Sequence, residues 1–122
     1  MGDEGASRND LAEDRTILAN ERTFASWMRT SLACIAIGIA FERLFSELSP
    51  PWLPRAIATG FCLLAVLVIV LAERRASAVL RRLSPHLVAS AQVVNLRLFT
   101  ALVSGGAVTL AAAMWMAAST GR

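Results

Sequence analysis

Three apolar segments constrain what this chain can fold into more than any other feature. They cover residues 30–41, 56–72 and 98–118 of a 122-residue chain in which 56% of the residues are hydrophobic. A helix needs about 20 mostly apolar residues to cross the hydrocarbon core of a bilayer. The second and third segments have that length or nearly so, and the first reaches it with its flanks. The pattern predicts an all-α membrane protein with three transmembrane helices.

The predicted organisation is a single domain over residues 10–122, after a disordered tail over residues 1–9. The run Asp10-Leu11-Ala12-Glu13 has the form of a capping box, so the first helix is expected to start there. The spans are expected at about residues 24–46, 54–73 and 97–118.

Proline and serine residues mark the predicted helix ends. Ser49-Pro50-Pro51 should end the first helix after Leu48, and Pro54 should open the second. Ser84 and Pro85 should cap the third. Since each helix is longer than its apolar segment, we expect all three to continue as helical extensions into the cytosol.

The basic residues predict an orientation in the membrane. The chain has twelve arginines, no lysine and a net charge of +3. Most arginines precede the first span or lie between the second and third, whereas the loop between the first two spans has only Arg43 and Arg55, offset by Glu42 and Glu47. Cytoplasmic loops collect basic residues, so we expect a cytoplasmic N-terminus and an external C-terminus. The same bias explains the basic clusters without nucleic acid as a partner.

The residues that usually carry catalysis are not arranged for it. No nucleophile has a base at a motif spacing, no glycine-rich phosphate loop occurs, and no metal-ligand spacing is present. Cys34 and Cys62 fall inside apolar segments and are interpreted as packing residues. We therefore expect no enzyme activity, no cofactor and no metal.

Arg22 and Arg29 lead directly into the first span. Twelve residues separate Arg29 from Glu42, which corresponds to about 18 Å of helix, so charge must lie at or inside the lipid boundary. Neither arginine has a carboxylate three or four residues away on its own helix. Its partner must be another helix, another subunit, a lipid phosphate or a bound anion. We favour headgroup anchoring for Arg22 and a buried or path-lining role for Arg29.

Further polar residues map to the same cytosolic boundary. They are Asn20, Glu21, Glu73, Asn95 and Arg97. With Arg22 and Arg29 they are predicted to form a polar ring in which Glu21 or Glu73 pairs an arginine. A structural clamp and an anion site both fit this ring. Ser31, within the span, is expected to bond to a carbonyl of its own helix.

Small residues recur at helical spacing in the first and third spans. Ala101, Gly105, Thr109, Ala113 and Ala117 follow one another every four residues, and the first span has Ala36 and Ala40 beside Gly38. Small side chains allow helices to approach closely in lipid. Packing among the three spans is the favoured interpretation, and the alternative is a surface for a homo-oligomer.

The run Leu18-Ala19-Asn20-Glu21-Arg22-Thr23-Phe24-Ala25-Ser26-Trp27-Met28-Arg29-Thr30-Ser31-Leu32 resembles the signature of the YidH-like family of bacterial inner-membrane proteins, a domain of unknown function. The positions that match the characteristic motif are Asn20, Glu21, Arg22, Thr23, Trp27, Arg29 and Thr30. That domain also resembles the membrane part of the vacuolar transporter chaperone, in which polyphosphate passes through a basic-lined path. The resemblance implies a multi-pass protein of the bacterial inner membrane, with Arg22 and Arg29 facing an anion route.

Two functions remain open from the sequence. In the first, the chain is an oligomeric subunit that forms a path for phosphate or polyphosphate, with Arg22 and Arg29 receiving the anion. In the second, it is a structural or adaptor protein that binds a membrane partner through its cytosolic helix ends and small-residue faces. The expected partners are the lipid bilayer, further copies of the chain and an anionic ligand.

Overall fold

A computed structural model of the chain describes residues 2–83 and 87–121, with side chains described for residues 2–82 and 94–121. It has three helices, α1 (Gly2–Leu44), α2 (Leu53–Leu83) and α3 (Leu87–Thr120). No strand occurs in the described part of the chain. All three helices are long and apolar enough to cross a membrane. The prediction of an all-α protein with three transmembrane helices is therefore confirmed.

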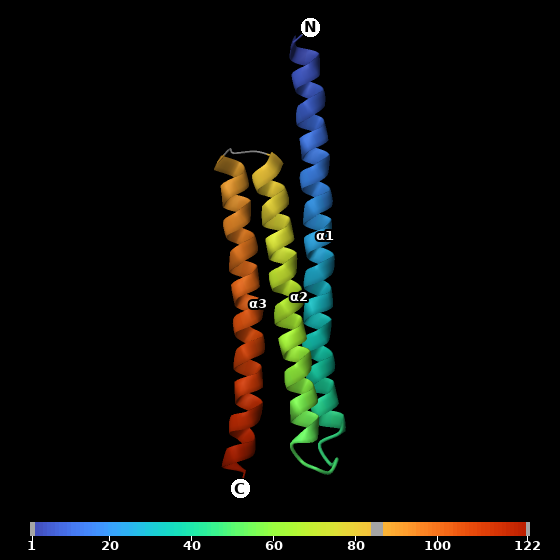
Figure 1. Cartoon of the computed structure of the whole chain (residues 1–122), viewed down its shortest axis with the longest axis vertical. Coiled ribbons are helices and arrows are strands. Elements are labelled where there is room, and N and C mark those ends of the chain that lie inside the picture. The colour runs from blue at the N-terminus through green and yellow to red at the C-terminus, as the bar shows by residue number, and fades with distance from the viewer. Residues whose placement is uncertain (1, 84–86, 122) are drawn as a thin grey trace.

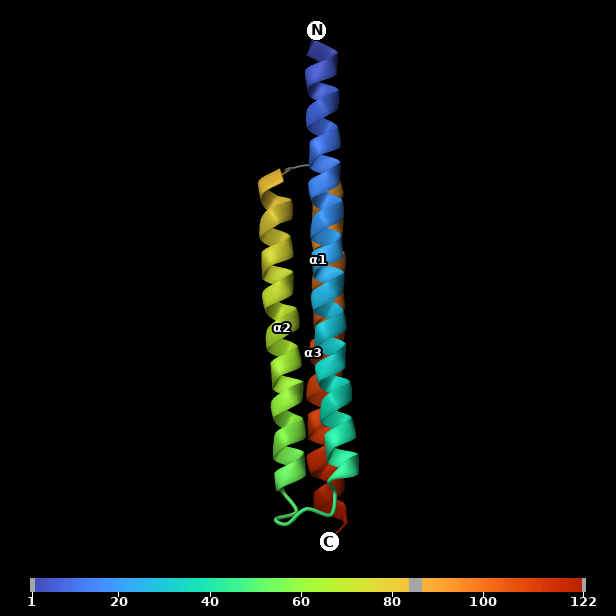
Figure 2. The ribbon, with the colours of Figure 1, turned by 90° about the vertical axis from the view of Figure 1, so that its right-hand side faces the viewer.

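The three helices run side by side, with α2 in contact with both others (Figures 1 and 2). In Figure 1 α2 lies between α1 and α3, whereas in Figure 2 α1 and α3 overlap on the same side of α2. The helices thus form an open triangle whose α1–α3 side is the least packed. We call the end with the α1–α2 connection and the end of α3 the turn end, and the opposite end, beyond which α1 projects, the N-terminal end.

The observed helix ends differ from the predicted ones for α1. The helix begins at Gly2, so neither the start predicted at Asp10 nor the disordered tail over residues 1–9 matches the structure. Asp3 and Glu4 lie in the first turn, where acidic side chains favour helix formation through the helix dipole. The helix also ends earlier than predicted, at Leu44.

The second helix opens close to the predicted place, because Pro54 lies in its first turn. It continues past its apolar segment to Leu83, as the predicted extension requires. Ser84 and Pro85, the predicted cap of the third helix, lie outside the described residues.

One face of α2 forms the centre of the bundle. Its buried apolar residues are Ala58, Cys62, Ala65, Ile69, Ala72, Ala76 and Leu80. They are three or four residues apart, which is the spacing of a packed helix seam, and four of them are alanines. Phe24 of α1 joins the Ile69, Ala72 and Ala76 cluster, with Leu96 of α3 packed against it. The small side chains let α2 approach both neighbours closely.

At Gly38, α1 approaches the backbone of α2 closely. A Cβ added at this glycine would lie 3.1 Å from the backbone oxygen of Ala58 and 3.1 Å from Cβ of Phe61. Few real Cβ atoms are in contacts this tight, so glycine is the residue that fits here. The one glycine between Asp10 and Leu48 thus sets the spacing of the two helices.

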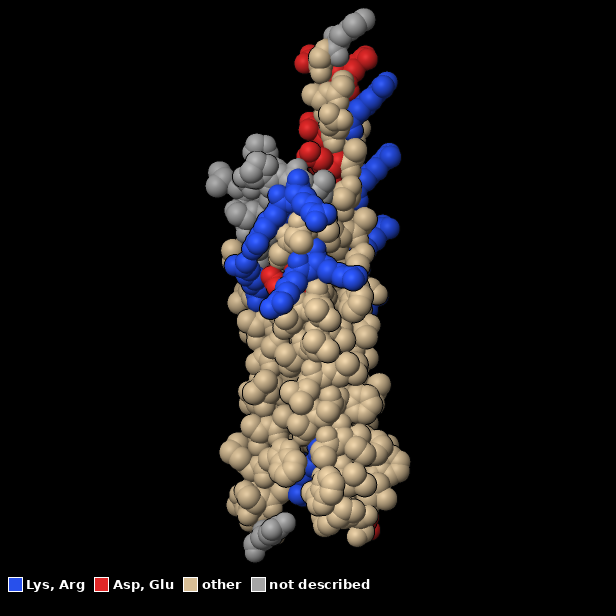
Figure 3. Space-filling view, in the orientation of Figure 1, with Lys and Arg blue, Asp and Glu red and all other residues tan. Residues whose placement is uncertain are grey.

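The outer surface of the bundle is apolar over most of its length. Figure 3 shows a band without charged residues between a charged N-terminal end and a few charges at the turn end. Leu63, Leu67 and Leu71 of α2 and Leu102 of α3 are among the large side chains exposed in this band. A surface of this kind is stable against lipid hydrocarbon, so the bilayer is a contact partner of the fold.

Candidate functional site

The polar residues predicted within α1 do not share one face of that helix. Phe24, Ser31 and Gly38 are the buried residues of this helix and mark the face that packs on α2. Arg22 and Arg29 are exposed. A helix turns by about 100° per residue, so both arginines lie on the side opposite the buried face. The seven-residue spacing between them aligns them on one exposed strip.

The same strip changes from arginine to alanine as it enters the apolar segment. Ala33, Ala36 and Ala40 follow Arg29 on this side of α1, and all three are exposed. The strip thus combines positive charge at its N-terminal end with small side chains along the span. We call Arg22, Arg29, Ala33, Ala36 and Ala40 the α1 outer face.

Neither arginine of the α1 outer face forms an ion pair with a residue that the structure describes. Within residues 2–82 and 94–121, the one ion pair is between Arg97 and Glu73, and neither Arg22 nor Arg29 lies within salt-bridge distance of a carboxylate. The arginine that pairs with Glu73, as predicted for one arginine of the polar ring, is therefore neither Arg22 nor Arg29. In a single chain both arginines are therefore exposed on the outer surface of the bundle.

A second group of the predicted residues does come together, between α2 and α3. The Nε atom of Arg97 lies 3.5 Å from a carboxylate oxygen of Glu73. The hydroxyl of Ser77 donates a hydrogen bond of 2.8 Å to the same carboxylate. The Glu73 side chain is 14% exposed and that of Arg97 is 59% exposed, so the pair lies at the edge of the bundle. It joins the two helices in the way expected of a clamp.

Asn20 joins α1 to α2 at the same level. Its Nδ2 atom donates a hydrogen bond of 3.2 Å to the backbone oxygen of Ala76. Ala76 lies one turn along α2 from Glu73, so the two polar contacts are neighbours. Asn20 is therefore a contact between helices.

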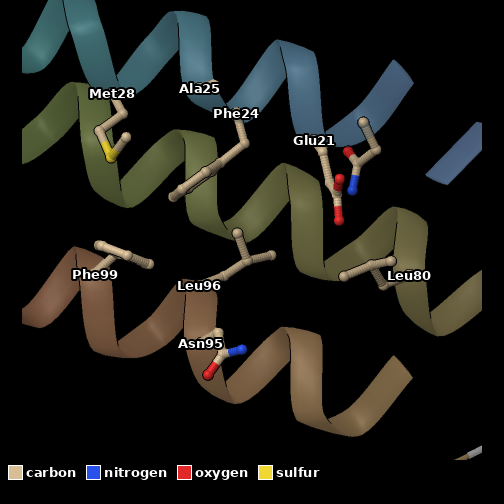
Figure 4. A pocket seen from close by; sticks show the side chains of 9 residues that line it. Glu21, Phe24, Ala25, Met28, Leu80, Asn95, Leu96 and Phe99 are labelled. Atoms are coloured by element: carbon tan, nitrogen blue, oxygen red, sulfur yellow. The ribbon is translucent and has the colours of Figure 1, made fainter. Parts of the chain in front are cut away.

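The polar residues Asn20, Glu21 and Asn95 line a groove on the open α1–α3 side (Figure 4). The groove has a volume of about 210 Å³. Its apolar walls are Phe24, Ala25 and Met28 of α1, Leu80 of α2, and Leu96 and Phe99 of α3. In Figure 4, Glu21 and Phe24 extend from α1 into this space. The predicted ring is thus divided: Asn20, Glu21 and Asn95 line the groove, whereas Arg22 and Arg29 lie on the α1 outer face.

The small residues predicted to pack the helices together do not do so within one chain. Ala36 and Ala40 of α1 and Ala101, Gly105, Thr109 and Ala113 of α3 are all exposed. The packing face of α3 instead has Thr100 and Ala107, both of which are buried. The spacing identified a strip of small residues correctly but placed it on the wrong side of each helix. Packing within the chain is therefore not what these residues provide.

Two hydrogen bonds between helices were not predicted from the sequence. Ser31 donates a hydrogen bond of 2.8 Å to the backbone oxygen of Ala65 in α2, so the expectation that it bonds within its own helix is wrong. The indole nitrogen of Trp115 in α3 donates one of 3.1 Å to the hydroxyl of Thr59 in α2. A polar residue on the buried face of an apolar helix was the available signal for Ser31.

Metal-binding residues do not gather anywhere in the described part of the chain. No group of three histidine, cysteine, aspartate or glutamate side chains is close enough to hold an ion there. Cys34 and Cys62 are free thiols on different helices, and Cys62 is buried in the α2 seam.

Comparison with known proteins places these features in a family. Residues 15–82 match a domain of unknown function, DUF202. An uncharacterized protein of Mycobacterium tuberculosis is 39% identical over 64 residues, which are 48% of this chain and 52% of that protein. The inner membrane protein YidH of Escherichia coli is 39% identical over 49 residues, 40% of this chain and 43% of YidH.

The chain thus spans about half the length of the curated relatives that it matches. No solved structure matches it. The matched residues 15–82 include Arg22, Arg29, Asn20, the Ser31 contact and Glu73, so both faces of α1 and the α2 seam belong to the shared domain. The protein is a small, multi-pass protein of the inner membrane, and it belongs to the YidH-like DUF202 family.

Proposed function

We propose that the chain is a non-catalytic assembly subunit of the inner membrane, which binds another membrane protein or a further copy of itself through the α1 outer face. The observation that carries this proposal is the exposure of Arg29 without a counter-charge in the described residues. A guanidinium at the lipid boundary costs free energy unless a group outside its helix pairs with it. The three alanines beyond it supply a surface that a second helix approaches closely.

The exposed small residues of α3 support the same proposal. Ala101, Gly105, Thr109 and Ala113 give the bundle a second strip without large side chains. In lipid, helix association depends on close packing and on hydrogen bonds, because lipid is as apolar as the helices. Two such strips on one small subunit fit repeated contact with neighbours, so a homo-oligomer is the preferred assembly.

Oxidative cross-linking in native membranes tests this proposal. In a background with Cys34→Ala and Cys62→Ala, Ala40→Cys is expected to give a disulfide-linked species. The matched control is Ile39→Cys, the adjacent exposed residue, which lies about 100° away around α1. A linked species of twice the chain's mass supports the homo-oligomer, and one of another defined mass supports an adaptor. Equal cross-linking of both variants, or no cross-linking of either, would show that the α1 outer face is not the contact surface of the assembly.

A second function is favoured by the positive charge of the same face. In an oligomer, Arg22 and Arg29 of adjacent subunits would line a path for an anion such as phosphate or polyphosphate. The lack of a carboxylate near either arginine in the described residues supports this, since a paired guanidinium would be neutralised.

Anion flux into liposomes distinguishes the path from the assembly role. Wild type is compared with Arg22→Ala and Arg29→Ala, and Arg74→Ala is the control because this exposed arginine lies on α2, away from the α1 outer face. Flux that both α1 variants lose while the oligomer stays intact supports a path. If wild type gives no anion flux but still cross-links, the path is excluded and only the assembly role remains.

A further inference from the structure

The turn end of the bundle has a hollow that the proposed assembly face does not include. It lies between the end of α1, the start of α2 and the C-terminal half of α3, with a volume of about 560 Å³. Its polar lining is Glu42, Arg43, Ser46 and Arg55. Figure 3 shows basic atoms recessed in the surface near this end. The size is in the range of pockets that take a small molecule or a lipid headgroup.

The charges of this hollow do not neutralise one another. Arg43 comes from α1 and Arg55 from α2, and Glu42 is the carboxylate beside them. Within the described residues, none of the three forms an ion pair. Two guanidinium groups and one carboxylate leave one net positive charge. The site therefore fits a ligand that carries a single negative charge.

The position of the hollow identifies the kind of anion. Glu42 and Arg43 directly follow the apolar segment of α1, so they lie where the hydrocarbon gives way to the headgroups. Arginine binds phosphate through its planar fork of donors, and basic residues at this depth attract anionic headgroups. A phosphodiester is the anion that is always present at that level of a bilayer.

The opposite wall of the hollow is apolar. Leu110, Ala113, Met114 and Ala117 of α3 form it. Ala113 and Ala117 belong to the exposed strip of small residues, which leaves room along α3 for an extended hydrocarbon chain. A polar wall and an apolar wall that meet at the membrane boundary match the two parts of a phospholipid.

We propose that this hollow binds an anionic phospholipid, with Arg43 and Arg55 on its phosphate and an acyl chain against the Ala113 and Ala117 wall of α3. Glu42 lowers the affinity, because it places a like charge near the phosphate. The site shares Ala113 and Ala117 with the small-residue strip of α3 but no residue with the α1 outer face, so its failure would leave assembly through the α1 outer face untouched.

Native mass spectrometry of the full chain in detergent tests this site with phosphatidylglycerol as the probe. Wild type is expected to retain phosphatidylglycerol in preference to diacylglycerol, which has no phosphate. The double variant Arg43→Gln, Arg55→Gln should retain roughly tenfold less, because two charge-assisted hydrogen bonds are lost. The control is Arg74→Gln, Arg75→Gln, which removes the same charge at the N-terminal end and should retain lipid as wild type does.

Two further measurements complete the test. Glu42→Gln should retain about twofold more phosphatidylglycerol, because a repulsive charge is removed, and excess inorganic phosphate should not displace the lipid, because phosphate has no acyl chain. Unchanged retention in the Arg43, Arg55 double variant, equal retention of diacylglycerol by wild type, or displacement by inorganic phosphate would overturn the proposal. So would lower retention by Glu42→Gln.

Discussion

Ser31 of α1 donates its hydroxyl to the backbone oxygen of Ala65 in α2 at 2.8 Å, and both residues are fully buried. This is a polar contact between two apolar helices at a point where neither water nor lipid headgroups reach. In hydrocarbon, a hydroxyl keeps its hydrogen bond either within its own helix or across to a neighbour. Ser31 bonds across, so it fixes the register of α1 on α2.

The first prediction concerns this bond. Ser31→Ala should lower the free energy of unfolding in detergent by about 0.6 kcal/mol and by no more than about 1.7 kcal/mol, the range measured for hydrogen bonds between membrane helices. The cost is small because the Ala65 oxygen keeps its bond within α2. Thermal unfolding followed by circular dichroism measures the change. Ser26→Ala, at an exposed position, should have no effect, and an equal loss there would contradict the assignment.

The second prediction concerns the close approach at Gly38. Gly38→Leu should separate α1 from α2 and destabilise the fold by several kcal/mol, because its Cβ meets the backbone of Ala58 and cannot move away. Gly38→Ala should cost less, since better helix propensity offsets part of the clash. The matched control is Gly60→Leu, where no atom lies within 4 Å of the added Cβ. Comparable melting temperatures for the Gly38→Leu and Gly60→Leu proteins would contradict a glycine-dependent contact.

The third prediction concerns the ion pair that joins α2 to α3. A double-mutant cycle of Glu73→Gln and Arg97→Gln should give a coupling energy below about 1 kcal/mol, because the Arg97 side chain is 59% exposed and solvent screens the pair. Glu73→Gln alone should cost more than Arg97→Gln alone, since it also removes the negative charge that strengthens the bond donated by Ser77. Denaturation at two salt concentrations measures both. A coupling that does not fall at high salt would argue against an exposed pair.

Sequence reasoning identified the helices because their apolar segments are long and separated by stretches of sequence that contain proline. Length and hydropathy are local properties, so α2 and its opening near Pro54 follow from them directly. The start of α1 was predicted too late, because the polar residues before Asp10 carry no apolar pattern although their acidic first turn favours a helix. The pairing of Glu73 with an arginine was predicted, but the partner, Arg97, was one of several candidates.

The sequence could not predict which face of each helix packs inside the bundle. Seven-residue spacing shows that Arg22 and Arg29 share a side of α1, yet it does not say whether that side meets α2 or the membrane. The same holds for the small residues of α3, where Gly105 is exposed and Ala107, two positions away, is buried. In lipid both faces of a helix are apolar, so hydrophobicity no longer marks the inside. Tertiary packing decides which face is buried, and on α1 the buried face includes Ser31 and Gly38.

The last prediction concerns the orientation of the bundle. The C-terminal part of α2 lies at the same end of the molecule as the projecting part of α1. It carries four arginines, Arg74, Arg75, Arg81 and Arg82. Basic residues are retained on the cytoplasmic side, so the N-terminal end should be cytoplasmic and the turn end external. Alkaline phosphatase fused after Gly121 should be active, and the same enzyme fused after Arg82 should be inactive. A fluorescent protein that folds only in the cytoplasm should give the opposite result at the two positions.

Replacing all four arginines with glutamine should weaken this preference and produce a mixed population, because the charge bias sets the orientation during insertion. An unchanged orientation in that variant would assign the bias to the arginines of α1 instead.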